Sequence, residues 1–196
     1  MTYEILSVKS KDKKSTLVQI ELLRENERKK YVVSEGTYRE IGCPLSGEEI
    51  DEDSIAALAE EDERRRALLK ALNILSYADN NERTLKRKLI TAGFSIAAAE
   101  SALRECVSLG YVNEEKQLEH LILKYNRELY GPKKIVAKLS SRSYLAKDVI
   151  KVIRSLEEAG EIDFAKSKQS LIKTKLPENA TYEERMKLLY KYGYIK

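Results

Sequence analysis

The sequence is poor in the residues that most often carry catalytic and metal chemistry. Its 196 residues include one histidine, two cysteines and no tryptophan. Cys43 and Cys106 form no CxxC pair and neither lies near His120, so a zinc site, a Ser/His/Asp triad and a Cys/His pair are poorly supported. Glycine-rich phosphate-binding motifs and EF-hand loops are also absent. We therefore expect no enzyme, no cofactor and no metal, with structural roles for these three residues.

Long apolar runs are also missing from the sequence. No stretch approaches the run of about 18 apolar residues that a membrane span needs, and the first residues lack the apolar segment of a signal peptide. Charged residues make up 35% of the chain and apolar residues 42%, which allows a packed core under a charge-dense surface. The sequence predicts a cytoplasmic protein, expected to be a monomer, with no membrane partner.

The net charge of +4 conceals an uneven distribution along the chain. Residues 1–62 contain 9 Lys and Arg against 15 Asp and Glu, whereas residues 63–196 contain 27 against 17. The net charge is therefore −6 for residues 1–62 and +10 for residues 63–196. The basic part suggests a surface for a polyanion or an acidic protein, and the alternative is a solvated helix face rich in lysine.

The acidic segment combines strand and helix signals. Apolar alternation predicts strands within residues 3–8, 15–23 and 29–35, with Val18, Ile20 and Leu22 on one side. Ser46 and Glu49 have the spacing of a capping box, which predicts a helix that begins there and continues through residues 60–66. We interpret residues 1–62 as an N-terminal extension with a β-hairpin and a helix.

The remaining residues contain an internal repeat. Residues 83–113 align with residues 133–163 at an offset of 50 without a gap, and apolar character is kept at helical spacing. The matched pairs include Leu85 with Ile135, Leu89 with Leu139, Phe94 with Tyr144, Leu103 with Ile153, and Gly110 with Gly160. A further step of 50 takes Gly93-Phe94, by way of residues 143–144, to Gly193-Tyr194 near the end of the sequence.

Each repeat is expected to form three helices, at about 64–77, 82–92 and 96–109 in the first. Gly93 and Gly110 stand where a left-handed residue ends a helix, and Pro132 fits a first helical position. We assign repeats to residues 63–112 and 113–162, with a truncated repeat at residues 163–196. The predicted fold class is mainly α: tandem three-helix repeats in an elongated curved array, with a small N-terminal extension that contains a β-hairpin.

Positive charge recurs on the predicted helices of these repeats. The apolar residues of these helices are expected to face inward, which leaves the basic residues facing outward. The basic residues form a stripe that is a candidate binding surface. Its members are Arg83, Lys86, Arg87, Lys133, Lys134, Lys138, Arg142, Lys147 and Lys151. Tyr125, Tyr130 and Tyr144 flank the stripe and suit either base stacking or core packing.

Residues 64–196 contain several motifs in a fixed order: Leu75, Arg83-Thr84, Lys88-Leu89, Gly93-Phe94, Leu109-Gly110-Tyr111-Val112-Asn113-Glu114, Tyr130-Gly131-Pro132-Lys133-Lys134-Ile135 and Lys138-Leu139. Together these motifs resemble the RecX family of recombinase regulators. The chain departs from the family pattern at Asn113-Glu114 and Gln117-Leu118, and at Ser143, where the family usually has glycine.

The resemblance implies a regulator, not an enzyme, that takes part in recombinational repair and the SOS response. Such a protein binds the RecA filament on DNA and inhibits its ATPase, strand-exchange and co-protease activities. The partners would be RecA and single- or double-stranded DNA, contacted directly or through RecA. The alternative from the charge distribution is an autonomous, non-specific nucleic-acid-binding module of helical repeats.

Overall fold

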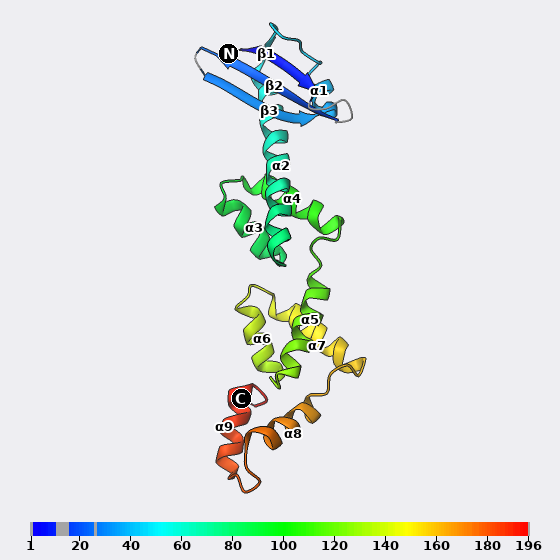
Figure 1. Cartoon of the computed structure of the whole chain (residues 1–196), viewed down its shortest axis with the longest axis vertical. Coiled ribbons are helices and arrows are strands. Elements are labelled where there is room, and N and C mark those ends of the chain that lie inside the picture. Colours follow the sequence, from blue (N-terminus) through cyan, green and yellow to red (C-terminus); the bar gives the residue numbers. More distant parts are fainter. Residues whose placement is uncertain (1, 11–15, 26, 196) are drawn as a thin grey trace. The chain divides into compact units, whose positions relative to one another are not determined.

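The chain is mainly helical with a small strand region at its N-terminus, which confirms the predicted fold class (Figure 1). A computed structural model describes residues 2–10, 16–25 and 27–195. The chain forms two compact units. The first comprises the described residues up to Ala78 together with Leu85–Tyr111, and the second comprises Asp79–Thr84 and the described residues from Val112 onward. The division into sequence repeats at residues 63, 113 and 163, and their end-to-end arrangement, stay predictions.

An antiparallel sheet forms the N-terminal part of the first unit. Its strands are β1 (Tyr3–Ser10), β2 (Leu17–Arg24), β3 (Glu27–Ser34) and β4 (Glu49–Ile50), in the order β3-β2-β1-β4. Val18, Ile20 and Leu22 are all buried on one face, as their alternation predicts. The predicted hairpin is therefore present as β2 and β3, within a larger sheet.

The prediction of a helix start at Ser46 is wrong. Glu49 and Ile50 pair with β1 as strand β4, and the buried Ile50 side chain joins the core beneath the sheet. Asp51 caps the helix instead, because its carboxylate accepts a hydrogen bond from the Ser54 amide at 2.8 Å. A short helix, α1 (Glu35–Glu40), which the sequence did not predict, follows β3 directly.

Helix α2 (Glu52–Tyr77) packs against two parts of the first unit, the sheet and helix α4 (Ile96–Ser108). Leu58 is buried in the core of the sheet, while Ala67 and Ala71 are buried farther along the helix. The Asp62 carboxylate accepts a hydrogen bond from the Val32 amide at 2.9 Å, and Arg65 donates to the Val32 carbonyl at 3.0 Å. These two side chains thereby occupy backbone groups on the outer edge of β3.

Helices α3 (Glu82–Thr91) and α4 lie close to their predicted ranges of 82–92 and 96–109. Ser95 caps α4, and the Glu63 carboxylate of α2 accepts hydrogen bonds from both the amide and the hydroxyl of Ser95 at 2.8 Å. Small side chains fill the buried side of α4, which allows close approach to α2. They are Ala98, Ala99, Ala102 and Cys106.

The second unit contains α5 (Glu114–Arg127), α6 (Pro132–Ser140), α7 (Ala146–Glu158), α8 (Phe164–Lys175) and α9 (Tyr182–Tyr192). Apolar residues of α5, α6 and α7 form one core. Its completely or almost completely buried members include Leu118, Ile122, Ile135, Leu139 and Val149.

Helix starts recur at an interval of 50 residues, and so does a hydrogen bond onto a backbone carbonyl, donated by a side-chain amide in one case and a backbone amide in the other. Helices start at residues 82, 132 and 182, at residues 96 and 146, and at residues 114 and 164. Within the second unit, the Asn81 side-chain amide donates to the Arg142 carbonyl at 2.7 Å. Fifty residues later the Gly131 backbone amide donates to the Tyr192 carbonyl, also at 2.7 Å. The same positions of the helical pattern therefore make equivalent contacts.

Candidate interaction surface

Helix α6 presents Lys133 and Lys134 to solvent. The helix begins at Pro132, whose missing amide proton costs nothing at a first helical position. Ile135 and Leu139, four residues apart, are completely buried, and both lysines are exposed. This geometry agrees with the placement that the apolar spacing predicted for them.

Two members of the predicted stripe rest against tyrosine rings. The Lys138 ammonium lies 4.5 Å from the ring centre of Tyr130 and 5.0 Å from that of Tyr125. The Arg142 guanidinium lies 6.0 Å from the ring centre of Tyr125. Cation–π contacts of this kind hold a cation in place while leaving part of it accessible. Lys138, which is half-buried, is therefore both a structural residue and a candidate contact.

Helix α7 has one apolar side and one basic side. Its buried residues belong to the core of the second unit, and its exposed cations Lys147, Lys151 and Arg154 follow one another at intervals of four and three residues. The exposed side also carries Ile150, whose side chain is 40% exposed. The same side lines a shallow depression together with Ser155 and Glu158. This surface can accept phosphates or carboxylates.

The three candidates on α3 differ in accessibility. Arg83 and Arg87 are exposed, whereas Lys86 is half-buried and donates to the Glu100 carboxylate of α4 at 2.6 Å. The hydrogen bond and charge of Lys86 hold the pKa of Glu100 below its usual value. Lys86 thus has an internal partner, and a ligand would have to compete with Glu100 for its ammonium group.

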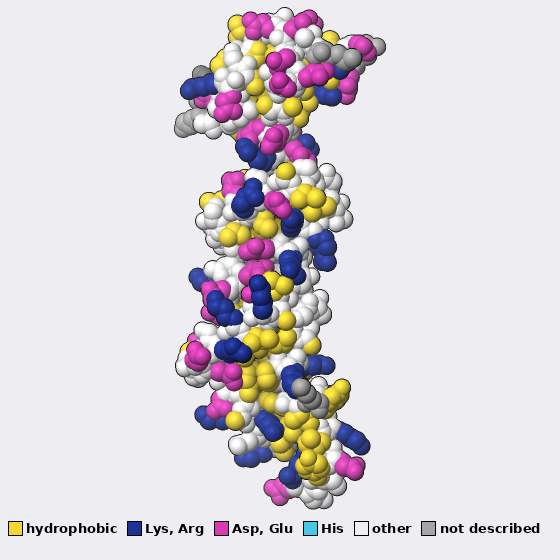
Figure 2. Space-filling model, turned by 180° about the vertical axis from the view of Figure 1, so that it is seen from behind, with side chains coloured by type: hydrophobic (Ala, Val, Ile, Leu, Met, Phe, Trp, Pro, Cys, Tyr) yellow, Lys and Arg dark blue, Asp and Glu magenta, His cyan; other side chains and the backbone are white. Residues whose placement is uncertain are grey.

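Carboxylates interrupt the basic surface of the second unit, and Figure 2 shows both charge signs over it. The Glu114 carboxylate accepts a hydrogen bond from the Glu82 amide at 2.8 Å. Burial raises the pKa of Glu114, and the charges of Glu82 and Asp148 raise it further. Within the described ranges, no cluster of His, Cys, Asp or Glu could hold a metal ion.

The tyrosines divide between core packing, one of the two roles that the sequence offered for them, and exposure to solvent. Tyr125 and Tyr144 are buried, so core packing accounts for these two. Tyr182 and Tyr190 on α9, which are not among the predicted site residues, are 76% and 68% exposed. The signal that would have identified them is their spacing of eight residues on one side of a predicted helix.

Comparisons with known proteins identify the fold. A crystal structure of regulatory protein RecX, 20% identical, matches with a TM-score of 0.64 over 97% of this chain and 94% of that chain. A crystal structure of RecX from Lactobacillus salivarius, 15% identical, matches 68% of this chain and 99% of that chain with a TM-score of 0.43. No protein-family model matches, and the comparison with curated proteins gave no match. In the described part of the chain no helix is both long and apolar enough to span a membrane. The first match covers both the N-terminal sheet and the helices that follow, and the chain therefore has the fold of regulatory protein RecX.

Proposed function

We propose that this protein is a cytoplasmic, monomeric regulator of the RecA recombinase that acts by binding and not by catalysis. It binds the RecA filament on DNA and inhibits ATP hydrolysis, strand exchange and co-protease activity. These activities belong to recombinational repair and the SOS response. The helical repeats follow one another along the filament, and their basic side chains contact acidic filament surfaces or the DNA.

The observation that carries this proposal is the fold match to regulatory protein RecX over 97% of the chain. The sequence motifs of residues 83–139, which resemble those of the RecX family, also support it. The exposed cations of α6 and α7 supply a surface chemistry that suits an acidic filament or phosphates.

The direct test is a titration of RecA ATP hydrolysis on single-stranded DNA with the full chain. We expect the hydrolysis rate to fall at ratios well below one protein per RecA protomer, because a protein that lies along a filament contacts several protomers. An unchanged rate and unchanged filament length at every ratio, up to equimolar, would refute the proposal.

Charge reversal locates the binding surface. The variant K133E/K134E changes exposed residues of α6, and K147E/K151E changes exposed residues of α7. The matched control K116E/K124E reverses two exposed lysines of α5 in the same unit. We expect each stripe variant to need at least tenfold more protein for half-maximal inhibition, and the control to behave like the native chain. Equal effects in all three variants would mean that only net charge matters.

The second candidate function is autonomous nucleic-acid binding, which the balance of +10 over residues 63–196 favours. It predicts tight DNA binding without RecA, with a log–log salt slope of about 0.9 per duplex phosphate neutralised. Loss of DNA affinity in the stripe variants, together with a loss of RecA inhibition that follows it in proportion, would favour this function. Loss of inhibition with DNA binding intact would favour the regulator.

A further inference from the structure

The exposed side of α7 carries a line of three cations. Lys147, Lys151 and Arg154 are exposed, and within the described part of the chain none of them forms a hydrogen bond or an ion pair. Their intervals of four and three residues correspond to rises of about 6 Å and about 4.5 Å along the helix axis. Ile150, which is 40% exposed, lines the same shallow depression of about 410 Å³ as these cations. These four residues are here called the α7 face.

The internal repeat indicates that the fold does not require the α7 face. Helix α4 stands 50 residues before α7, and both helices are 13 residues long. Each packs its other side into the unit to which it belongs. The positions of α4 equivalent to Lys147, Ile150 and Lys151 hold Ala97, Glu100 and Ser101. The cations of α7 are therefore not needed for packing and are free to contact another molecule.

A second depression, of about 190 Å³, has the opposite charge and lies against the same helix. Lys151 lines both depressions, and the buried side chains of Leu118 and Val152 give the second one an apolar lining. Its other lining residues are Glu114, Glu115 and Asp148. Three carboxyl groups against one lysine make this depression acidic. A cation placed in it would favour the ionised form of these groups, against the burial that raises the pKa of Glu114.

This arrangement of charge favours a protein helix over a nucleic acid as the ligand. A polyanion laid along the cations would also meet the Glu158 carboxylate, which lines the basic depression, and the Asp148 carboxylate beside Lys151. Phosphates gain nothing from Ile150, whereas an apolar side chain does. A protein helix can present carboxylates, an aliphatic side chain and a basic side chain on one surface, which matches all three features.

We propose that the α7 face binds a helix of a partner protein, whose carboxylates meet Lys147, Lys151 and Arg154 and whose basic side chain enters the acidic depression. An aliphatic residue of the partner helix packs on Ile150. Because α7 belongs to the binding surface of the proposed function, on which this inference rests, that part of the surface is assigned to a protein and not to DNA.

A peptide derived from α7 is the probe. It has the sequence of residues 146–158 with the changes K147E, K151E, R154E and S155K. An antiparallel helix centred on Lys151 brings its glutamates to the three cations and the introduced lysine close to Asp148. Alanine-based extensions at both ends lengthen the peptide beyond about 15 residues, so that it forms a helix in water. Alanine also replaces the residues that are buried in the chain, which are Val149, Val152, Ile153 and Leu156.

Fluorescence anisotropy measures binding of this peptide to the full chain. We expect saturable binding, and at least tenfold weaker binding of a peptide that keeps the native Lys147, Lys151 and Arg154. A peptide without S155K should bind several-fold more weakly, although it is more negative. Absence of saturable binding would overturn the proposal. Equal or tighter binding without S155K would also overturn it, because the attraction would then depend on net charge alone.

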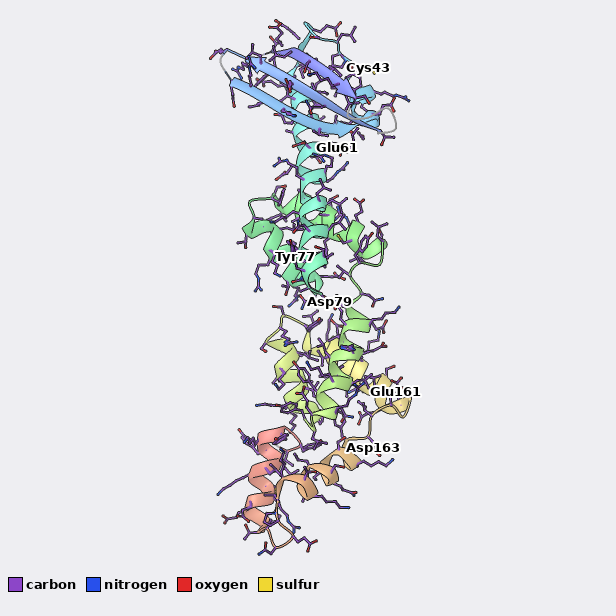
Figure 3. The ribbon with its side chains drawn as sticks, in the orientation of Figure 1. Cys43, Glu61, Tyr77, Asp79, Glu161 and Asp163 are labelled. Atoms are coloured by element: carbon purple, nitrogen blue, oxygen red, sulfur yellow. The ribbon has the colours of Figure 1, made fainter. Side chains whose placement is uncertain are left out.

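Variants of the chain locate the binding. K147E/R154E should weaken binding at least tenfold, and D148K should weaken it several-fold although it makes the chain more positive. The control E161K reverses an exposed carboxylate just after α7, labelled in Figure 3, and should keep the native affinity. Circular dichroism checks that each variant is folded. Unchanged affinity of K147E/R154E, or tighter binding to D148K, would exclude the proposed contacts.

The same assay separates a protein helix from a nucleic acid as the ligand. An unlabelled oligothymidylate is added to the complex of the native chain with the labelled peptide. We expect no displacement, because the carboxylates beside the cations repel phosphates. Displacement would overturn the proposal in favour of a nucleic-acid surface. RecA is absent from these measurements, so peptide binding without inhibition of RecA, or inhibition without peptide binding, shows which of the two proposals has failed.

Discussion

Replacing Gly193 by alanine tests the contact between the end of α9 and the start of α6. Gly193 has a φ of +82°, and a Cβ added there would lie 2.4 Å from the backbone nitrogen of Lys134. Gly160 has a similar φ of +73°, but a Cβ there would meet nothing within 4 Å. Both G193A and G160A place alanine in the left-handed region, which costs about 1–2 kcal/mol. The difference between them therefore isolates the close approach to Lys134.

The magnitude of this difference follows from the contacts that alanine would disrupt. The Gly131 amide donates to the Tyr192 carbonyl at 2.7 Å, and the Lys133 amide donates to the Gly193 carbonyl at 3.2 Å. The rings of Tyr130 and Tyr192 stack with centres 5.4 Å apart. Two backbone hydrogen bonds and one ring pair, at about 1 kcal/mol each, make G193A about 3 kcal/mol less stable than G160A.

Urea denaturation followed by circular dichroism measures the free energy of unfolding of both variants. Hydrogen exchange of the Gly131 and Lys133 amides should accelerate in G193A and stay slow in G160A, because only the former separates α9 from α6. If both variants lose the same stability, the contact between Gly193 and Lys134 carries no energy and the reasoning is refuted.

Two further predictions concern single side chains of the second unit. Ser143 has a φ of +70° in a position where the repeat otherwise has glycine, so S143G should raise the free energy of unfolding by up to about 1 kcal/mol. The control S140G, at the last position of α6, should lower the free energy of unfolding by about 0.5 kcal/mol or less. Thermal melts in which both variants shift in the same direction would contradict the explanation for Ser143. Burial raises the pKa of Glu114 above its usual 4.5, so this carboxyl contributes stability at low pH that is lost as the pH rises through the raised pKa. In E114Q the free energy of unfolding should no longer fall in this way as the pH rises. Urea denaturation from about pH 4 to about pH 7 measures it, and the same pH dependence in E114Q as in the native chain would refute this role of Glu114.

The helical part of the fold was predictable because its signals are local. The start of α6 follows from Pro132, its buried side follows from Ile135 and Leu139 four residues apart, and both features lie within one helix. The same holds for the helix ends at Gly93 and Gly110, whose positive φ values the structure confirms. Repetition at an offset of 50 strengthened each of these local predictions, since the same pattern occurs more than once.

Contacts between distant segments were not predictable in the same way. Glu49 and Ile50 form strand β4 because they pair with Tyr3 and Glu4, and nothing in residues 46–50 alone distinguishes that outcome from a capping box. The side chains that pair with basic residues of the stripe also come from distant segments of the chain. Lys86 reaches Glu100, and Lys138 lies over two tyrosine rings, only after the helices have packed.

Helix α2 joins the two parts of the first unit, because it packs against both the sheet and α4. At 26 residues it is about 39 Å long, with one half beneath the sheet and the other against α4. Melting the sheet alone would strip Leu58 of its neighbours and leave half of the rod without lateral support. Melting the helices alone would release Asp62 and Arg65 from β3. Under heat or pulling force, the sheet and the α2–α4 pair should therefore unfold together in one cooperative transition. The second unit should unfold in a separate transition.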